Sequence, residues 1–86
     1  MGEIDIIAQK GEYLCFVEVK LRRNADYGEA REFVTRSKQK KIILAAKYYL
    51  LKNQTELQPR FDVVEVYMPK GTDGKTYVRL LEDAFE

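Results

Sequence analysis

The sequence predicts a small α/β domain in which a mixed β-sheet of about four strands consists of two hairpins joined by a helix. Three observations predict this fold. Two alternating apolar runs flank a Lys10-Gly11 turn, a helical apolar pattern covers residues 36–52, and a third extended run follows at 60–67. A strand–helix–strand connection of this length favours parallel pairing with a right-handed crossover.

Length and composition indicate one globular domain over residues 1–86. The chain is 45% hydrophobic and 34% charged, with a net charge of +1, so it is neither a basic coat protein nor an acidic tail. Cys15 is the single cysteine and histidine is absent, which excludes a disulfide framework and a Cys/His zinc site. No apolar run approaches the ~20 residues of a membrane span. We therefore expect a cytoplasmic protein without a membrane partner, with Cys15 as a buried thiol.

The first hairpin is expected to pair a strand at residues 3–9 with a strand at 13–20. Gly11 tolerates the positive φ that a tight turn needs. A two-residue Lys10-Gly11 loop would place Gln9 opposite Glu12, and the rest of the register follows from that pair.

The charged side chains of this hairpin are predicted to share one face, because side chains alternate along a strand. In the expected register Asp5 and Glu18 are diagonal neighbours, and Lys20 lies one step beyond Glu18. That face also carries Glu3, Ile7, Leu14 and Phe16, and the apolar Leu14 and Phe16 indicate that it is covered rather than open. The opposite face is purely apolar and is expected to form the core; it carries Ile4, Ile6, Ala8, Tyr13, Cys15, Val17 and Val19.

The remaining elements follow from caps and turns. Thr35 is a good helix N-cap and Asn53 a plausible C-cap. A short helical turn is conceivable at 29–33, a turn is expected at 71–74, and residues 76–81 should pair back as a strand before a helical or irregular tail. The apolar stripe of the helix comprises Ile42, Ile43, Ala46, Tyr49 and Leu50.

Two carboxylates and an ammonium group on one sheet face suit phosphodiester cleavage. Carboxylate oxygens are the ligands that Mg²⁺ or Mn²⁺ prefers, and the metal polarises phosphoryl oxygens and acidifies an attacking water. A lysine two residues after a ligand can stabilise developing negative charge. The alternative is a solvent-facing ladder in which Glu18 and Lys20 only pair with each other.

A locally basic segment runs from Lys20 to Lys41. Its functional interpretation is a surface that contacts the phosphate backbone through Arg22, Arg36, Lys38 and Lys41. The alternative is an ordinary solvated helix face. Tyr48 and Tyr49 are expected to pack rather than to stack on bases, and Asp62 is expected to bond locally rather than to bind metal.

Five segments in order carry a resemblance: GEIDIIA, FVEVK, VTRSKQKKIILAAKYYL, RFDVVEV and EDAF. Together they resemble the bacterial YraN-like family of predicted endonuclease-related proteins over nearly the whole chain. The resemblance implies a restriction-endonuclease-like fold with a PD-(D/E)xK site. By resemblance, Asp5 matches the first carboxylate, Glu18 and Lys20 match the E-x-K pair, and Lys38 or Gln39 stands where related nucleases carry a supporting polar residue.

The chain departs from that pattern in two ways. Ile4-Asp5 replaces Pro-Asp, and a segment that relatives carry before GEID, supplying a helix, a strand and often a further acid, is missing. The resemblance thus implies a sheet truncated at its N-terminus. An exposed strand edge invites association, so we expect a homo-oligomer, most simply a dimer.

These observations predict a metal-dependent nuclease-like domain that hydrolyses phosphodiester bonds of nucleic acid, DNA in the first instance. Asp5 and Glu18 would bind Mg²⁺ or Mn²⁺, and Lys20 would assist the chemistry. The residues expected to contact nucleic acid are Arg22, Arg36, Lys38, Gln39 and Lys41. Two alternatives stay open: a non-catalytic nucleic-acid-binding or assembly module of the same fold, and a shortened form without function.

Overall fold

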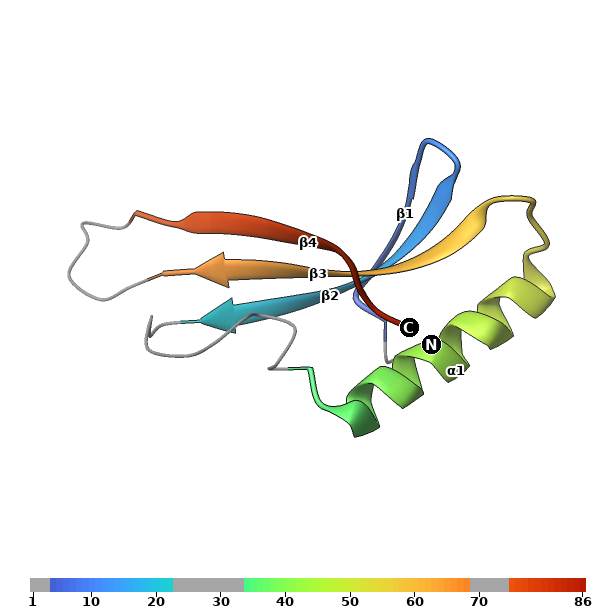
Figure 1. The fold of residues 1–86 in the computed structure, drawn as a ribbon, viewed down its shortest axis with the longest axis horizontal. Coiled ribbons are helices and arrows are strands. Elements are labelled where there is room, and N and C mark those ends of the chain that lie inside the picture. The colour runs from blue at the N-terminus through green and yellow to red at the C-terminus, as the bar shows by residue number, and fades with distance from the viewer. Residues whose placement is uncertain (1–3, 23–33, 69–74) are drawn as a thin grey trace.

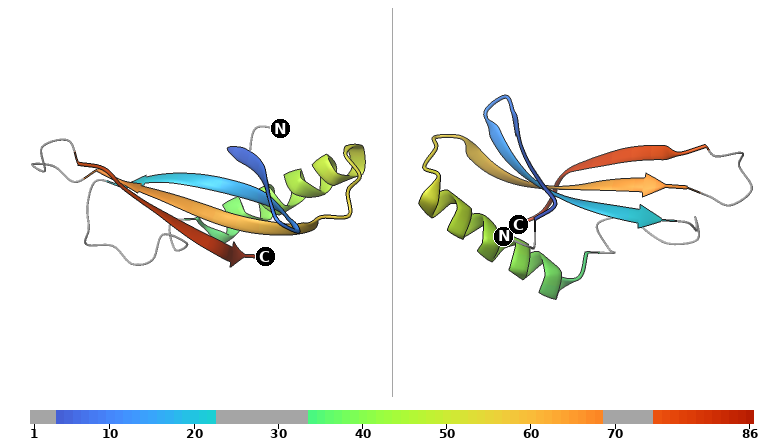
Figure 2. Two further views of the ribbon diagram at one scale, coloured as in Figure 1. Left: turned by 90° about the horizontal axis from the view of Figure 1, so that it is seen from above. Right: turned by 180° about the vertical axis from the view of Figure 1, so that it is seen from behind.

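A computed structural model describes residues 4–22, 34–68 and 75–86 of the chain and shows one mixed four-stranded sheet with a single helix in that part (Figures 1 and 2). The elements are β1 (Ile6–Lys10), β2 (Tyr13–Arg22), α1 (Arg36–Lys52), β3 (Gln58–Tyr67) and β4 (Tyr77–Phe85). The predicted α/β class with about four strands is confirmed. The turns expected at 29–33 and 71–74 lie outside the described residues.

The strands lie in the order β1-β2-β3-β4. β1 pairs with β2 and β3 with β4 in antiparallel fashion, whereas β2 and β3, which α1 connects, run parallel. The expected order of hairpin, helical crossover and hairpin is therefore confirmed. The views in Figures 1 and 2 show that the sheet is strongly twisted and that α1 lies along one of its faces.

The register of the first hairpin differs from the prediction by two residues. Lys10 pairs with Tyr13, so the loop consists of Gly11 and Glu12. Gly11 has φ +57° and occupies the first loop position, where a tight hairpin turn favours glycine. Because the shift is even, the paired residues from Ile6 onward keep their predicted faces. Ile4, which precedes β1, does not: it packs against both buried clusters of the core. The first strand is also shorter than the expected residues 3–9, and Glu3 lies outside the described part.

The main core lies on the face that carries Leu14 and Phe16, not on the purely apolar face where it was predicted. Leu14, Phe16 and Ala46 form one buried cluster, in which the sheet packs directly against α1. Ile6, on the predicted core face, is 47% exposed, although Cys15 and Val17 on that face are buried as expected. The alternation of strand residues separates two faces but does not reveal which of them the helix covers.

A second buried cluster continues the core toward the N-terminal end of α1. It contains Val34, Ile42, Val63 and Phe85. The Phe61 ring joins the two clusters, since its centroid lies 5.7 Å from that of Phe16 and the two rings are stacked.

Both predicted ends of the helix are confirmed. The Thr35 side chain accepts a hydrogen bond of 3.1 Å from the Lys38 backbone N–H. At the other end, the backbone N–H and side-chain amide of Asn53 donate to the Tyr49 carbonyl at 2.8 and 3.0 Å. No helix in the described part of the chain combines the length and the apolar character needed to cross a membrane.

The two adjacent tyrosines of α1 behave differently. The Tyr49 ring packs edge-on against Phe16 with centroids 5.8 Å apart, as expected for a core residue. Tyr48 is 53% exposed, so the prediction that it packs is wrong. Successive helix residues point about 100° apart, which takes Tyr48 off the inner face.

The last strand is longer than the predicted residues 76–81, and the expected helical or irregular tail is wrong. β4 extends to Phe85 through an irregular register opposite Phe61 and Val63. Asp83 takes φ 53° at this bulge. A bulge re-aims a strand, and here Phe85 beyond it is only 8% exposed and stacks on Phe61 with centroids 5.3 Å apart.

Candidate active site

Asp5 and Glu18 come together from the two arms of the first hairpin. The first observed pair is Ile6–Val17, so Asp5, in the bend directly before β1, reaches the level of Glu18, and the two side chains share a hydrogen bond. The two-residue shift in register thus turns the predicted diagonal neighbours into direct ones. Side chains in directly opposed positions are the closest pairs that a hairpin offers.

Asp5 is held by the backbone of the opposite strand. Its Oδ2 accepts a hydrogen bond of 2.9 Å from the Val19 N–H. This bond is the main reason that the pKa of Asp5 lies below its ordinary value; burial opposes it, while a hydrogen bond with Glu18 and the charges of Lys38 and Lys20 lower the pKa further. Asp5 is exposed, so it carries a negative charge at neutral pH on the solvent side of the pair.

Glu18 has the opposite character. It is 6% exposed, and among the described residues its buried Oε2 accepts no hydrogen bond. Burial raises the pKa of Glu18 to about 7, and the hydrogen bond and negative charge of Asp5 act in the same direction. A carboxylate in such a position needs either a proton or a nearby cation.

Two lysines supply part of that positive charge. Lys38 Nζ, from the first turn of α1, lies 3.9 Å from Glu18 Oε2. Lys20 is half-buried two residues after Glu18 on the same face, and its charge lowers the pKa of both carboxyls. These contributions are smaller than that of burial, since the pKa of Glu18 stays raised.

Glu65 is a buried acid near this site that the sequence analysis did not single out. It is 6% exposed and lies opposite Lys20 in the parallel register of β2 and β3. The signal was present in the sequence: Glu65 shares its strand face with Phe61 and Val63, both of which pack in the core.

The carboxylate pair fits a hard divalent cation in its chemistry. No group of three or more His, Cys, Asp or Glu side chains with metal-binding geometry occurs within residues 4–22, 34–68 and 75–86. Mg²⁺ does not require such a group, because it commonly binds through one or two carboxylates and completes its shell with water and substrate phosphate. The buried Glu18 Oε2 is an oxygen that such an ion could use.

Four of the residues predicted to contact nucleic acid, Arg36, Lys38, Gln39 and Lys41, lie in the first turns of α1. Lys38 approaches Glu18, whereas Arg36 and Gln39 line a cavity beside the first turn of α1. Lys41 is exposed on the outer side of the helix. Arg22 is the last residue of β2.

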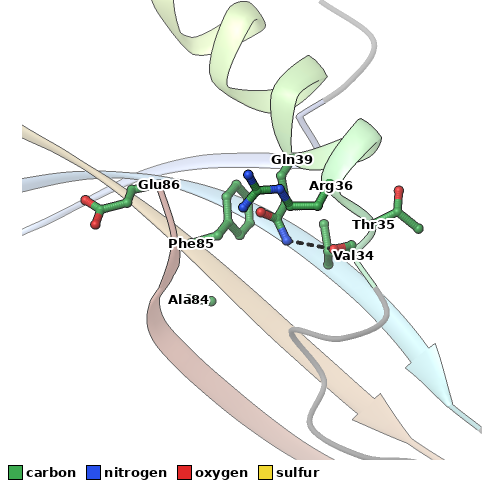
Figure 3. Close-up of a pocket in the computed structure, with 7 residues that line it drawn as sticks. All are labelled: Val34, Thr35, Arg36, Gln39, Ala84, Phe85 and Glu86. Carbon is green, nitrogen blue, oxygen red and sulfur yellow. Dashed lines mark hydrogen bonds between the residues drawn. The ribbon is translucent and has the colours of Figure 1, made fainter.

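That cavity has a volume of about 550 Å³ and is bounded by α1 and the end of β4 (Figure 3). Its lining consists of Val34, Thr35, Arg36, Gln39, Ala84, Phe85 and Glu86. The Gln39 side-chain amide donates to the Val34 carbonyl at 2.8 Å. The Gln39 side chain thus binds the backbone segment directly before the helix. Lys38, in the first turn, instead approaches the Glu18 carboxylate.

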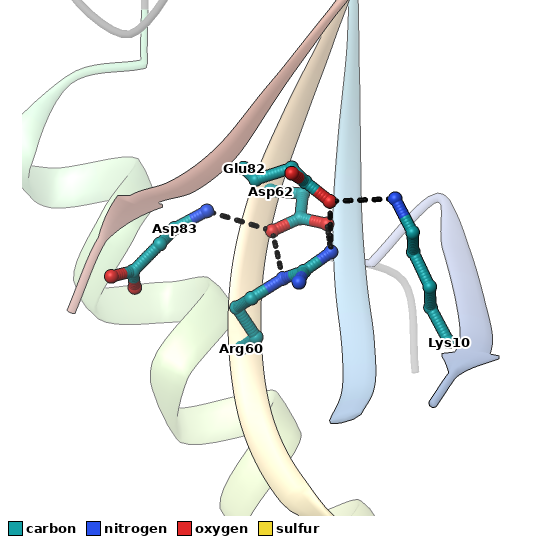
Figure 4. A network of polar contacts seen from close by, with 5 residues as sticks. All are labelled: Lys10, Arg60, Asp62, Glu82 and Asp83. Carbon is teal, nitrogen blue, oxygen red and sulfur yellow. Dashed lines mark hydrogen bonds and ion pairs between the residues drawn. The ribbon is translucent and has the colours of Figure 1, made fainter. Parts of the chain in front are cut away.

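A separate ionic network lies on the opposite sheet face (Figure 4). Arg60 binds both carboxylate oxygens of Asp62 at 2.9 and 2.8 Å, and the Asp83 N–H donates to Asp62 at 2.9 Å. Burial acts to raise the pKa of Asp62, but these bonds and the charge of Arg60 outweigh it, so the pKa is lowered. Asp62 thus bonds locally, as predicted.

Comparison with known proteins identifies relatives along the whole chain. The model of the uncharacterised protein family UPF0102 matches residues 1–66. A UPF0102 protein of Acetivibrio thermocellus is 48% identical over 99% of this chain and 68% of its own length, and one of Symbiobacterium thermophilum is 49% identical over 98% and 70%. A third, from Nitrosospira multiformis, is 42% identical over 99% and 68%. The resemblance to the YraN-like family is confirmed, and the chain belongs to the UPF0102 family.

Proposed function

We propose that this chain is a metal-dependent, nuclease-like domain of the restriction-endonuclease-like class that hydrolyses nucleic-acid phosphodiester bonds, DNA in the first instance. One observation carries the proposal: Asp5 and Glu18 meet on one sheet face, and a buried oxygen of Glu18 accepts no hydrogen bond from the described residues. The hairpin, crossover helix and parallel third strand that support this pair agree with the proposed fold class.

Each side chain has a distinct part in the proposed chemistry. Asp5 and Glu18 would hold Mg²⁺ or Mn²⁺, which when bound supplies charge to polarise the phosphoryl group and acidify water. The ammonium group of Lys20 would stabilise negative charge that develops on the phosphate. Lys38, from α1, would help to neutralise the Glu18 side of the pair. The Val19 N–H keeps Asp5 oriented and ionised.

Metal binding can be tested by thermal unfolding with and without Mn²⁺. Because the ion would bind only the folded chain, we expect the melting temperature to rise; at a concentration of about 100 times Kd the stabilisation is about 2.7 kcal/mol. Asp5→Ala should abolish the rise. Glu82→Ala, which removes a carboxylate on the opposite face, is the matched control and should keep it. Equal shifts in wild type and Asp5→Ala would rule out this site.

Turnover needs its own assay. Labelled single-stranded, duplex and branched DNA and RNA should be incubated with the chain and either Mg²⁺ or Mn²⁺ and separated on gels. We expect cleavage that disappears in both Asp5→Ala and Lys20→Ala. Cleavage that survives both substitutions would point to a contaminating nuclease and against the proposal.

The contact between Lys38 and Glu18 favours a second function, a non-catalytic nucleic-acid-binding or assembly module. An ammonium group 3.9 Å from the buried carboxylate oxygen can take over part of the role of a metal ion. A binding module predicts salt-dependent DNA binding that survives Glu18→Gln, without cleavage under any divalent ion. Cleavage by the wild type that is lost in Glu18→Gln would favour the nuclease.

Self-association is a further part of the proposal. β1 is an edge strand of only five residues, and Ile6 on it is 47% exposed. Edge strands with exposed apolar side chains can pair with a second chain. Light scattering should show a dimer at micromolar concentration, and Ile6→Lys should shift it to monomer. A stable wild-type monomer under these conditions would contradict this part.

A further inference from the structure

The outer side of α1 carries a second apolar stripe in addition to the one that packs on the sheet. Leu44, Tyr48 and Leu51 are 56%, 53% and 75% exposed. They follow one another at intervals of four and three residues, which places them in one line along the helix. The line spans about 60° around the helix axis and about 10 Å along it. We call these three residues the outer ridge.

Lysines border the outer ridge on both sides. Lys40 and Lys47 lie on one side, seven residues apart, and Lys41 and Lys52 lie toward the other; all four are exposed. In coiled-coil terms Leu44 and Leu51 occupy d positions and Tyr48 an a position. Lys40 and Lys47 then occupy g positions and Lys52 an e position, which are the positions whose charges select the partner helix, and Lys41 stands at the a position one heptad before Tyr48.

This charge pattern argues against a second copy of the same helix. In a parallel pair, Lys47 at g would face Lys52 at e of the other chain. In an antiparallel pair, g positions face g positions, so Lys40 and Lys47 would face other lysines. Like charges across such an interface are unfavourable in both orientations, whereas carboxylates there are favourable.

The width of the stripe distinguishes a helix from a membrane as its partner. A helix that lies in a lipid surface usually presents an apolar face of about 100° or more. The outer ridge is narrower, like a coiled-coil seam. The opposite side of α1 is fixed by Ile42, Ala45 and Ala46, which are buried, so the helix cannot turn more apolar surface outward without leaving its core.

We propose that the outer ridge of α1 docks an amphipathic helix of another protein whose apolar stripe is bordered by Asp or Glu. The docking surface is independent of the proposed nuclease site, since Lys38 reaches Glu18 from a different side of the helix. The partner would therefore bind without covering the carboxylate pair, as a subunit that recruits or positions this domain.

Two designed helical peptides test the proposal. Both carry Leu at a and d positions over about 20 residues, long enough for helix formation in isolation; one has Glu and the other Lys at e and g. Binding to the full chain is followed by NMR titration and calorimetry. We expect the Glu peptide to bind at least about tenfold more tightly than the Lys peptide, with shifts centred on α1.

Substitutions locate the binding surface. Tyr48→Ser should weaken binding of the Glu peptide about tenfold or more. Tyr77→Ser removes a tyrosine of similar exposure, 55%, from β4 and should leave binding unchanged. The double substitution Lys47→Glu and Lys52→Glu should reverse the preference, so that the Lys peptide binds more tightly. This charge reversal is informative even if Tyr48→Ser alters the fold.

Three outcomes would overturn the proposal. Equal binding of the two peptides would remove the charge argument. Binding to phosphatidylcholine–phosphatidylglycerol vesicles that requires Tyr48, without binding to the Glu peptide, would identify a lipid surface. Light scattering that shows a dimer lost on Leu44→Ser would identify a second copy of this chain.

Discussion

Glu18 and Asp62 are buried carboxyls on neighbouring strands, and they differ mainly in the face to which they point. Glu18 is 6% exposed on the face covered by α1, and Asp62 is 2% exposed on the other. Burial acts to raise the pKa of both. The pKa of Glu18 rises to about 7, whereas that of Asp62 falls below its ordinary value.

The two pKa values shift in opposite directions because the two carboxyls have different hydrogen-bond and charge partners. Asp62 has a bidentate guanidinium and a backbone N–H within 2.9 Å. Glu18 has another acid, Asp5, beside it and an ammonium nitrogen only at 3.9 Å. Charge-assisted hydrogen bonds with good geometry compensate for desolvation, and a distant ion pair does not. A buried acid whose oxygens are all paired, such as Asp62, stabilises the fold, whereas one with an unpaired oxygen, such as Glu18, can accept a ligand.

The largest expected effect comes from breaking the paired side. Asp62→Ala removes the bidentate carboxylate partner of Arg60, which then keeps only its contact of 3.0 Å with the half-exposed Glu82, and it removes the acceptor for the Asp83 N–H. We expect the free energy of unfolding to fall by about 3–5 kcal/mol, which urea denaturation would measure. Asp5→Ala, on the exposed side of the other pair, should cost much less. A loss below about 1 kcal/mol for Asp62→Ala would contradict the structural role assigned to it.

The next effect sharpens the comparison through pH. Folded Glu18 keeps its proton up to about pH 7, while the unfolded residue loses it near 4.5. The folded state therefore binds more protons between these values, and its stability falls as the pH rises through this window. Glu18→Gln should remove this penalty and stabilise the fold at pH 8 by up to about 3 kcal/mol, with no gain at pH 4.

Thermal unfolding of wild type and Glu18→Gln across this pH range measures the effect. Asp5→Asn is the matched partner variant. Without the neighbouring negative charge the pKa of Glu18 should be less raised, so the pH range over which the fold loses stability should become narrower. A gain for Glu18→Gln that is the same at pH 4 and pH 8 would show that packing, rather than ionisation, is responsible.

A smaller effect concerns the turn that brings Lys38 to Glu18. Thr35 caps this turn by accepting a hydrogen bond from the Lys38 N–H. Thr35→Ala should destabilise the fold by about 1 kcal/mol, and Thr35→Ser should retain most of the stability. Denaturant unfolding of the three proteins measures both values. Equal losses for Ala and Ser would show that the methyl group, not the hydroxyl, matters at this position.

The ends of secondary-structure elements were predicted correctly where they depend on residues close in the chain. Thr35 and Asn53 marked the ends of α1 correctly, because capping depends on residues close in the chain. The register was wrong by two residues, because the choice between Lys10-Gly11 and Gly11-Glu12 depends on the loop position that glycine occupies. The path of β4 to Phe85 was missed, since it depends on a bulge stabilised by Asp62 and by stacking on Phe61.

The part of the site that depends on the alternation of side chains along a strand was predictable from the sequence. Parity placed Asp5, Glu18 and Lys20 on one face, and an even error in register left that result intact. Leu14 and Phe16 beside Glu18 correctly indicated that this face is covered, but that α1 covers it could not be derived from the hairpin. The sequence could not decide whether Lys38 or Gln39 lies near the carboxylates, because this depends on how the helix is rotated about its axis. Adjacent helix residues point about 100° apart, so only one of the two faces Glu18.

The smallest expected effect concerns an exposed ion pair that is as short as the contacts of Asp62, and it tests whether such a pair contributes to stability. Lys10 Nζ lies 2.8 Å from Glu82 Oε2, but the two side chains are 64% and 45% exposed. Exposed pairs gain little, because water solvates each charge well and salt screens the attraction. Lys10→Met should therefore leave the urea midpoint nearly unchanged, and unchanged altogether in high salt. A loss comparable to that of Asp62→Ala would mean that distance, rather than burial, governs these acids, and the contrast between the two sheet faces would then need another cause.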